Sequence, residues 1–596
     1  MTDGVRTLCD IFLQVAASGK PDVLISKVGG EWKAISAADF GYTVRALSLG
    51  LNALGVQPGD RVAILSENRP EWAMTDYAVL CAGAWSVPVY PTLPANQIAP
   101  LLTDCGARAI FVSSLEQLGK ILTIRAQCPA LEYVIAFDAS PPQEPGFLSF
   151  GQAVDRGRPA LDMNPAAFEQ RARRVRPEDV ATIIYTSGTT GEPKGAMLTH
   201  GNLVSNVLGA LQVVPITGEG KALCFLPLSH VFERMLDYAY LCRGSSIAYA
   251  ESFEKLKDNF LEVNPHCFGA VPRVYEKVHS RILQKVESEG GPKKKIFQWA
   301  VRVGKAKLAC DERSEPVPAG LALKARIADA LVFKKIRHAL GAHFRFAVSG
   351  AAPLSRELAE FFWGAGVTIY EGYGLTETSP VICVNGPQAW RLGTVGRPIP
   401  GVEVRIASDG EILTRGPHVM KGYLNKPEAT ADAIDPDGWF HTGDIGQLDS
   451  DGYLSITDRK KDVIVLAGGK KAAPQPIETE LKKSAFIGLP IVLGDRHKFL
   501  AVLIVPNFDR LREVAAERRI AFEPETIDAN PEIRALFQKE IDAYNADKPH
   551  HEQIRAFALL PSDLTIEDGS ITPTLKVKRR ILESRYQTLI DRMYQA

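Results

Sequence analysis

Short apolar runs, separated by amphipathic stretches, dominate the first two-thirds of the chain. The clearest runs are Arg61–Leu65, Ala109–Val112, Tyr133–Ala136, Ala181–Tyr185 and His343–Val348. Helix-like stretches between such runs are typical of βαβ units, and this pattern predicts parallel sheets. Because the runs are apolar at nearly every position instead of alternating, we expect helices to cover both faces of each sheet.

The pattern changes after Gly401, where short strand-like runs follow one another closely. Turn dipeptides separate them at Asp409-Gly410, Asp437-Gly438 and Asp451-Gly452. Such spacing is typical of antiparallel hairpins. We therefore expect a β-rich subdomain that closes the large body.

A dense cluster of charges at residues 458–462 lies between two apolar runs. About 135 residues follow it, with strand and helix patterns of their own. This change predicts the main domain boundary. The sequence thus predicts an α/β fold with a large N-terminal body at residues 1–460 and a smaller α+β domain at residues 461–596.

The composition adds little to this picture, except that the chain as a whole has no excess of positive or negative charge. The chain has 596 residues, 46% of them hydrophobic, and Lys plus Arg equal Asp plus Glu at 69 each. This profile is typical of a globular protein of several domains, and we expect no nucleic-acid partner. The nine cysteines are scattered without metal-ligand spacing, which favours a cytoplasmic location. We recognise no secretory signal, and no apolar run reaches the roughly 18 residues that span a bilayer.

A loop rich in glycine and hydroxyl groups follows the apolar run that ends at Tyr185. Glycines let backbone amides approach phosphate oxygens, hydroxyls donate hydrogen bonds, and Lys194 adds a cation. The pattern is not that of a P-loop, because glycine follows Lys194 and Pro193 obstructs a helix there. We predict a polyphosphate site made of Thr186, Ser187, Gly188, Thr189, Thr190, Gly191 and Lys194.

This loop resembles the signature of the AMP-forming acyl-adenylate synthetases. A second segment, Tyr370–Thr378, resembles the family motif that contacts adenine, phosphate and magnesium. The resemblance implies that Glu377 binds Mg²⁺ beside the Thr186 hydroxyl. A carboxylate suits a hard cation that keeps waters and phosphate oxygens as its other ligands. The remaining nucleotide contacts implied in this motif are Glu371, Gly372, Tyr373 and Thr376.

Two further segments resemble parts of the nucleotide site in that family. Gly350 and Ala351 lie in a segment of small residues against which a flat adenine ring would pack. Asp444 matches the aspartate that accepts hydrogen bonds from the ribose hydroxyls, and Arg459 resembles its partner for ribose or phosphate. Without the resemblance, Gly350, Ala351 and Asp444 would be interpreted as parts of ordinary turns.

Two lysines of the predicted C-terminal domain take their predicted roles from the resemblance. Lys576 matches the catalytic lysine, whose ammonium neutralises charge while a carboxylate attacks the α-phosphate. Lys461 matches the hinge residue, about which the smaller domain would rotate as a mobile lid between adenylation and thioester formation. The plainer alternatives are a solvated basic tail and a surface charge.

His230 lies in a segment that resembles the family motif near the acyl carboxylate. Together with Ser66–Trp72 and Val271–Lys277, this segment is similar to the long-chain acyl-CoA synthetase branch. The resemblance implies a catalytic role for His230, although a lone histidine is more often structural. Arg234 stands where some relatives have a tryptophan gate, so no gating role is transferred.

The segment at residues 293–340 mixes lysine and arginine with large apolar side chains such as Phe297 and Phe333. Two interpretations remain open. The segment is either a solvated helical face over an apolar stripe, or a surface that rests on anionic lipid at the inner face of a membrane.

The residues and the resemblance together predict an enzyme that uses ATP to convert a long-chain fatty acid into acyl-AMP, releasing pyrophosphate. The acyl group then passes to coenzyme A. The expected partners are the fatty acid, ATP and coenzyme A, with Mg²⁺ as the metal. Two alternatives remain: a fatty acyl-AMP ligase that loads the thiol of a carrier protein, and a non-catalytic lipid-binding scaffold that keeps the fold. The sequence leaves the oligomeric state open.

Overall fold

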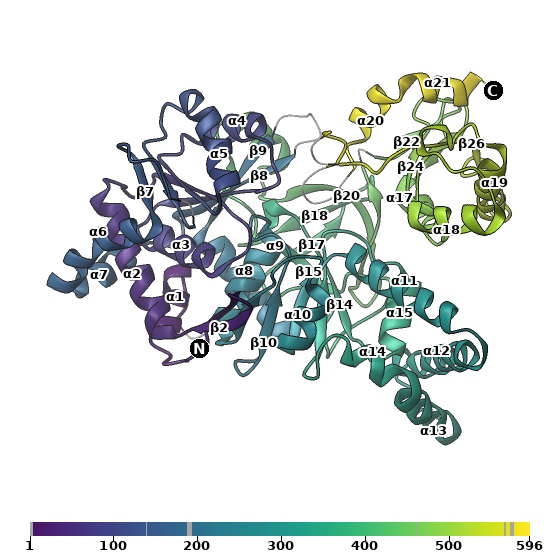
Figure 1. Cartoon of the computed structure of the whole chain (residues 1–596), viewed down its shortest axis with the longest axis horizontal. Helices are drawn as coiled ribbons and strands as arrows, with labels where there is room; N and C mark the ends of the chain where they lie inside the picture. Colours follow the sequence, from purple (N-terminus) through teal and green to yellow (C-terminus); the bar gives the residue numbers. More distant parts are fainter. Residues whose placement is uncertain are drawn as a thin grey trace. The chain divides into compact units, whose positions relative to one another are not determined.

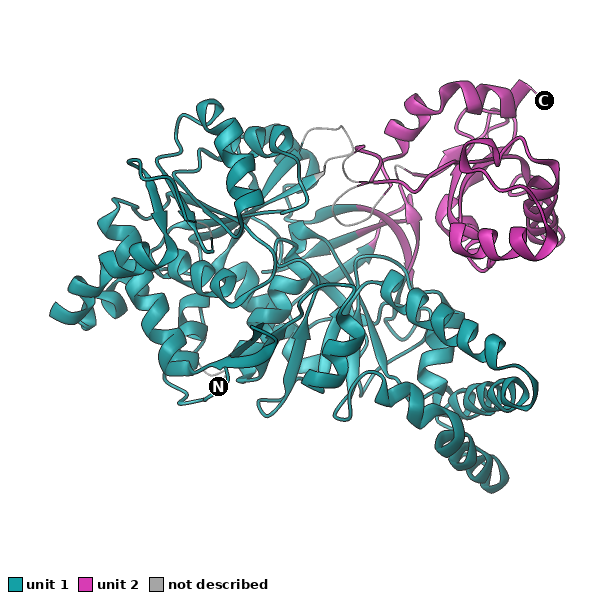
Figure 2. Ribbon diagram, in the orientation of Figure 1, with its two compact units in different colours: residues 1–405, 413–442, 448–455 teal, residues 406–412, 443–447, 456–596 magenta. Residues whose placement is uncertain are grey.

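The computed structural model describes residues 4–138, 140–187, 193–460, 462–565, 568–571 and 577–595 (Figure 1). The chain divides into two compact units (Figure 2). The first unit contains residues 1–405, 413–442 and 448–455, and the second contains residues 406–412, 443–447 and 456–596.

Two large sheets, each mainly parallel, form the centre of the first unit. The nine-stranded sheet has the order β16 (Arg397–Pro398), β15 (Val381–Val384), β14 (Ile369–Gly374), β13 (Phe346–Ser349), β12 (Cys267–Ala270), β10 (Lys221–Cys224), β11 (Ser246–Tyr249), β1 (Leu24–Val28) and β2 (Glu31–Ile35). The eight-stranded sheet has the order β19 (Gly422–Tyr423), β9 (Pro193–Thr199), β8 (Val180–Ser187), β4 (Trp85–Val89), β3 (Arg61–Leu65), β5 (Ala109–Val112), β6 (Tyr133–Ala136) and β7 (Phe147–Ser149).

The apolar runs predicted as strands are confirmed, with one shift in position. Strands β3, β5 and β6 have the predicted bounds, and β8 contains the predicted run. β13 begins at Phe346 and not at His343, because the chain turns just before it. The Ala342 N–H donates to Asn264 Oδ1 at 2.8 Å, and the Phe344 N–H donates to the Gly341 carbonyl at 3.3 Å. Residues held in this turn cannot join the strand ladder.

Helices connect the strands of the first unit, and β5, β11, β12 and β13 are buried along their whole length. This burial agrees with cover on both faces of the sheets. The α-helices are α1 (Leu8–Ala16), α2 (Ala37–Ala53), α3 (Pro70–Cys81), α4 (Ala95–Cys105), α5 (Leu115–Ile124), α6 (Phe150–Met163), α7 (Ala166–Ala172), α8 (His200–Val213), α9 (Val231–Arg243), α10 (Leu256–Val263), α11 (Pro272–Glu289), α12 (Gly291–Glu312), α13 (Ala319–Ala328), α14 (Lys334–His338), α15 (Arg356–Gly364) and α16 (Pro427–Ala433). Short 3₁₀ or π turns are η1 (Arg125–Gln127), η2 (Asp329–Phe333) and η3 (Thr376–Thr378). The predicted α/β fold is confirmed.

The β-rich segment predicted after Gly401 forms a four-stranded sheet. Its strand order is β17 (Glu403–Ile406), β18 (Glu411–Arg415), β20 (Phe440–Leu448) and β21 (Leu454–Arg459). The predicted turns have the expected backbone. Gly410, Gly438 and Gly452 have φ angles of 89°, 81° and 81°, a conformation that favours glycine.

The second unit contains smaller sheets and its own helices. A three-stranded sheet has the order β24 (Ile487–Leu493), β25 (Leu500–Pro506) and β26 (Ile554–Leu559), and β22 (Ile464–Val465) pairs with β23 (Lys471–Ala472). Its helices are α17 (Pro474–Leu481), α18 (Phe508–Arg518), η4 (Pro524–Thr526), α19 (Pro531–Asn545), α20 (Arg579–Arg585) and α21 (Gln587–Gln595). Across the described parts of both units, no helix is long and apolar enough to cross a bilayer.

A buried ion pair ties α9 to α3 and to β8. Arg234 and Asp76 are each 1% exposed. The Arg234 guanidinium donates to both carboxylate oxygens of Asp76, at 2.5 and 3.2 Å, and to Thr182 Oγ1 at 2.7 Å. The Tyr238 hydroxyl donates to the same carboxylate at 2.5 Å. Loss of either charged partner would leave the other buried and unpaired, at a cost of about 3–5 kcal/mol.

Candidate active site

The glycine-rich loop joins two antiparallel strands. Thr186 of β8 pairs with Lys194 of β9, and the Thr186 hydroxyl donates to the Lys194 carbonyl at 3.4 Å. Pro193 begins β9, so a strand and not a helix follows the loop, unlike in a P-loop. Gly188, Thr189, Thr190 and Gly191 lie outside the described residues, and Ser187 is described only as the end of β8.

Glu377 lies on η3, directly after β14. The residue is 9% exposed, and within the described parts of the chain no ion pair engages its carboxylate. Gly374, at the end of β14, permits the close approach that places η3. A Cβ atom at this position would lie 1.6 Å from the Pro380 carbonyl oxygen. The result is a mostly buried carboxylate at the end of a central strand.

Tyr423 connects Lys194 with Glu377. Its backbone pairs with Ala196 of β9. The Tyr423 hydroxyl donates to Glu377 Oε1 at 2.8 Å, and Lys194 Nζ lies 5.1 Å from the centre of the Tyr423 ring. Burial, together with the neighbouring Glu377 carboxylate, raises the pKa of Tyr423 well above its usual value. The phenol is therefore a proton donor to the carboxylate at neutral pH.

The small residues Gly350 and Ala351 follow β13 and lie beside β14. Ser349 pairs in parallel with Glu371, so the turn begins next to the middle of β14. Ala351 has a φ of 68°, a left-handed conformation that is uncommon for residues other than glycine and that strains β-branched or bulky side chains. Glu371 is 7% exposed, and burial raises the pKa of its carboxyl group to about 8. Glu371 is therefore a neutral hydrogen-bonding group at pH 7.

His230 caps the N-terminus of α9. Its Nδ1 accepts a hydrogen bond from the Phe232 N–H at 3.2 Å, which satisfies one of the free amides of the first turn. A Cβ atom at Gly350 would lie 3.3 Å from the Phe232 ring. The first turn of α9 is thus packed against the Gly350–Ala351 turn, which brings His230 to the same edge of the nine-stranded sheet.

The second unit holds the remaining described site residues. Asp444 of β20 is 5% exposed, and its Oδ1 lies 3.2 Å from Arg459 Nε on β21. Lys460, the next residue, pairs with Glu411 at 2.8 Å and with Asp409 at 2.7 Å. The predicted hinge Lys461 and the predicted catalytic Lys576 lie outside the described residues.

Comparison with known proteins identifies the family. A family model described as AMP-binding enzyme matches residues 13–424, which is more than half of the chain. The chain belongs to the AMP-binding enzyme family. A second model, for the C-terminal domain of AMP-binding enzymes, matches residues 461–596. The family predicted from the two signature motifs is confirmed.

Relatives of this AMP-binding enzyme match it along nearly its whole length. The long-chain-fatty-acid–CoA ligase FadD15 of Mycobacterium tuberculosis is 38% identical over 96% of this chain and 95% of its own length. The peroxisomal long chain acyl-CoA synthetase 6 of Arabidopsis thaliana is 33% identical over 95% of this chain and 82% of its own. A solved anthranilate CoA ligase with bound anthranoyl-AMP shares the fold, with a TM-score of 0.72, 19% identity and 98% coverage of both chains.

The structure of this AMP-binding enzyme brings several predicted residues together within the first unit. Thr186 and Lys194 lie on one hairpin, and Tyr423 links that hairpin to Glu377. Gly372, Tyr373 and Thr376 lie between Glu371 and Glu377 on β14 and η3. Asp444 and Arg459 form a separate pair in the second unit.

Tyr423 is the residue that motif analysis missed. The available signal was the pair Gly422-Tyr423, where Gly422 has a φ of 142° and begins the two-residue strand β19. A two-residue strand is too short to show any hydrophobic period. Only its pairing with β9, more than 220 positions earlier in the sequence, shows that Tyr423 contacts both charged residues.

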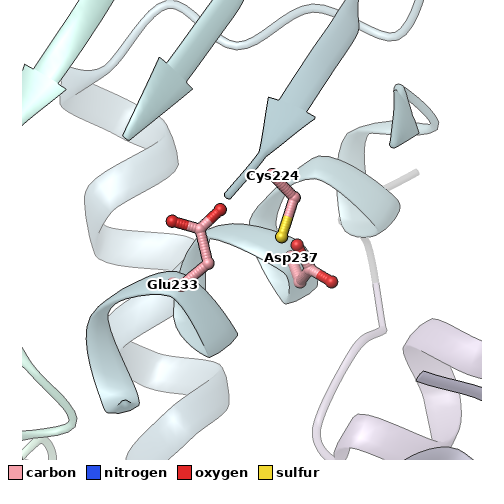
Figure 3. A group of neighbouring side chains, drawn as sticks. All are labelled: Cys224, Glu233 and Asp237. Carbon is pink, nitrogen blue, oxygen red and sulfur yellow. The ribbon is translucent and has the colours of Figure 1, made fainter. Parts of the chain in front are cut away.

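A second group of titratable side chains, shown in Figure 3, lies in the interior of the AMP-binding enzyme. Cys224 ends β10, and Glu233 and Asp237 lie one turn apart on α9. Their possible ligand atoms are all within 4.8 Å of one another, and all three residues are buried. In the described structure, neither oxygen of Glu233 has a hydrogen-bond partner. The Tyr249 hydroxyl donates to Asp237 Oδ2 at 3.0 Å.

Burial favours the protonated forms of these three side chains. It raises the pKa of Asp237 to about 7 and raises the pKa values of Glu233 and Cys224 well above their usual ranges. Protonated acids and a thiol are poor metal ligands, because ligands must lose their protons to bind. We therefore interpret the three side chains, at the end of β10 and on α9, as a buried proton-holding group.

Replacing Asp237 with asparagine should flatten the pH dependence of stability. The unfolded carboxyl ionises near pH 3.8, whereas the folded one keeps its proton to about pH 7. The folded state binds more protons in this window, so the free energy of unfolding falls as pH rises through it. In Asp237→Asn this fall should shrink by up to about 4 kcal/mol. Urea unfolding at a series of pH values measures the effect.

The matched control is Asp162→Asn, at an exposed position. It should leave the pH dependence unchanged. An Asp237→Asn protein whose stability falls as steeply as the wild type's would contradict the proton-holding interpretation.

Proposed function

We propose that this chain is an AMP-forming long-chain fatty-acid–CoA ligase. Its similarity to the mycobacterial long-chain-fatty-acid–CoA ligase over 96% of this chain carries this conclusion. In the first reaction an oxygen of the fatty-acid carboxylate bonds to the α-phosphorus of ATP, and pyrophosphate leaves. In the second, the sulfur of coenzyme A bonds to the acyl carbon, AMP leaves, and the thiol proton is lost.

The hairpin of β8 and β9 is the proposed phosphate site. Thr186, Ser187 and Lys194, with Gly188, Thr189, Thr190 and Gly191, would bind the phosphate oxygens. The support is chemical, since hydroxyls, backbone amides and one ammonium are the groups that bind polyphosphate. The contact between Lys194 and the Tyr423 ring holds the ammonium near the mouth of the hairpin.

Glu377 and Thr186 are the proposed Mg²⁺ ligands. The residues present fit this metal, because Glu377 is a mostly buried carboxylate that no described ion pair neutralises. Oxygen ligands of this type suit Mg²⁺. When bound, the metal would neutralise phosphate charge. The Tyr423 hydroxyl acts as a positioning group, because its hydrogen bond orients the Glu377 carboxylate.

We assign the binding of the adenine and ribose of ATP to two groups of residues. Gly350 and Ala351, together with Glu371, Gly372, Tyr373 and Thr376, would contact adenine and its neighbouring phosphate. The side chains at Gly350 and Ala351 are small, so a flat base could approach the backbone beside β14. Asp444 would accept hydrogen bonds from the ribose hydroxyls, and its contact with Arg459 orients its carboxylate.

His230 and the two lysines complete the proposal. His230 would lie near the acyl carboxylate, with its ring orientation fixed by the helix cap. Lys576 would stabilise the charge that develops during adenylation. Lys461 would be the hinge between an N-terminal domain at residues 1–460 and a lid domain at residues 461–596, which would rotate between the two half-reactions.

We further place the enzyme in the cytoplasm, in peripheral contact with the inner face of a membrane through residues 293–340. In support of a reducing compartment, all nine cysteines are free thiols and eight are buried. Long-chain fatty acids partition into bilayers, so a membrane is the natural source of this substrate.

A chain-length series tests the proposed function. Purified enzyme with ATP and fatty acids of increasing length should release pyrophosphate and form acyl-CoA in equal amounts, with long chains preferred. Pyrophosphate release without coenzyme A consumption would instead favour a ligase that loads a carrier protein. Absence of ATP-dependent pyrophosphate release with every acid would overturn the assignment and leave the scaffold alternative.

A further inference from the structure

Helix α13 and the turn η2 carry apolar side chains on two faces. One face packs inward, where Ala328 and Phe333 form a small core with Ala300 and Val303 of α12. The opposite face exposes Leu323, Ile327 and Leu331, which are 61%, 45% and 50% exposed. Their spacing of four residues places them in one row along the helix. An apolar stripe that faces inward is usual for a surface helix. The outer row, in contrast, belongs to none of the hydrophobic clusters of the described fold.

Cations flank this outer row. Lys324, Arg326, Lys334 and Lys335 are all exposed, and none of them forms an ion pair in the described part of the chain. Asp329 is the only acid between Pro318 and His338, and Arg337 neutralises it at 2.6 Å. The row of large apolar residues is therefore bordered by four uncompensated positive charges. Figure 1 shows α13 at the outer end of the helices that follow α11, away from the two large sheets.

We propose that the outer face of α13 and η2 docks on the surface of an anionic phospholipid bilayer. Leu323, Ile327 and Leu331 enter the boundary between headgroups and acyl chains, and the four cations contact the phosphate groups. This inference names the surface for the membrane contact proposed above and rests on the proposed function, since the bilayer supplies the fatty acid. Charge complementarity excludes a second copy of this face as the occupant, because it would bring eight like charges together.

Vesicle sedimentation with the full-length enzyme tests the proposal. The wild type should bind vesicles of phosphatidylcholine mixed with phosphatidylglycerol at least about tenfold more tightly than vesicles of phosphatidylcholine alone. A variant with Leu323→Gln, Ile327→Gln and Leu331→Gln should lose about tenfold or more in binding. A variant with Lys324→Gln, Lys334→Gln and Lys335→Gln should lose the preference for phosphatidylglycerol.

The matched control carries Leu115→Gln, Leu122→Gln and Met163→Gln, three exposed apolar positions on other helices, and should bind like the wild type. Unchanged binding of the Leu323, Ile327 and Leu331 variant would overturn the proposal. A change in its oligomeric state without lipid would also overturn it, in favour of self-association. Pyrophosphate release with a dissolved fatty acid should stay at the wild-type rate in all variants, so failure of the docking surface and failure of the proposed function give different results.

Discussion

Replacing Lys576 with alanine is expected to slow acyl-adenylate formation by about 10²–10³-fold, while thioester formation from supplied acyl-adenylate changes little. The attacking carboxylate and the α-phosphate are both negative, and their approach requires a cation that stabilises the developing charge. After the adenylate has formed, that requirement ends. The first half-reaction is measured by ATP-dependent pyrophosphate release and the second by acyl-CoA formation from purified acyl-adenylate.

Lys578→Ala is the matched control for this experiment, because it removes a lysine two positions away in the same basic cluster. It should affect neither half-reaction strongly. An equal loss in both half-reactions of Lys576→Ala would contradict the assigned role and point to a general disturbance of the second unit.

Glu377→Gln is expected to lower the rate of adenylation by about 10²-fold, equivalent to about 2.7 kcal/mol in the activation free energy. The amide keeps the shape of the side chain and an oxygen that can accept from Tyr423, but it loses the charge that holds a divalent cation. Higher Mg²⁺ concentrations should restore part of the rate. The measurement is pyrophosphate release across a magnesium titration.

The control for Glu377 is Glu428→Gln, at an exposed position on α16. Its magnesium dependence should match that of the wild type. The temperature of unfolding of Glu377→Gln should stay close to the wild-type value. If the variant kept both the wild-type rate and the wild-type magnesium dependence, Glu377 would not be a metal ligand.

Elements with a continuous apolar composition were predictable from the sequence, whereas elements defined by pairing with a distant strand were not. The buried strands β3, β5 and β6 are apolar because parallel sheets are covered on both faces, so their composition shows their position. The strand β13 begins later than predicted, because the residues just before it form a turn. In this turn a backbone N–H donates to the Asn264 side chain, so these residues do not join the sheet although their composition is typical of a strand. Local composition cannot show such a competing hydrogen bond.

The candidate site shows the same division. Its glycines, hydroxyls and Glu377 lie in continuous motifs, so a resemblance could identify them. Tyr423 lies in a two-residue strand, and its significance depends on a partner strand far away in the sequence. The outer face of α13 was equally hard to recognise, because an apolar residue in a helix can face inward or outward, and only the packed core of Ala328 and Phe333 distinguishes the two.

The buried pair of Arg234 and Asp76 limits how this protein can be altered by mutation. A tryptophan at position 234 would leave the Asp76 carboxylate enclosed without a cation, so this single substitution would be strongly destabilising. Asp76 would have to change in the same step, and Thr182 and Tyr238 would need new partners. Position 234 thus accommodates an aromatic side chain only when residues on α3 and α9 are replaced together.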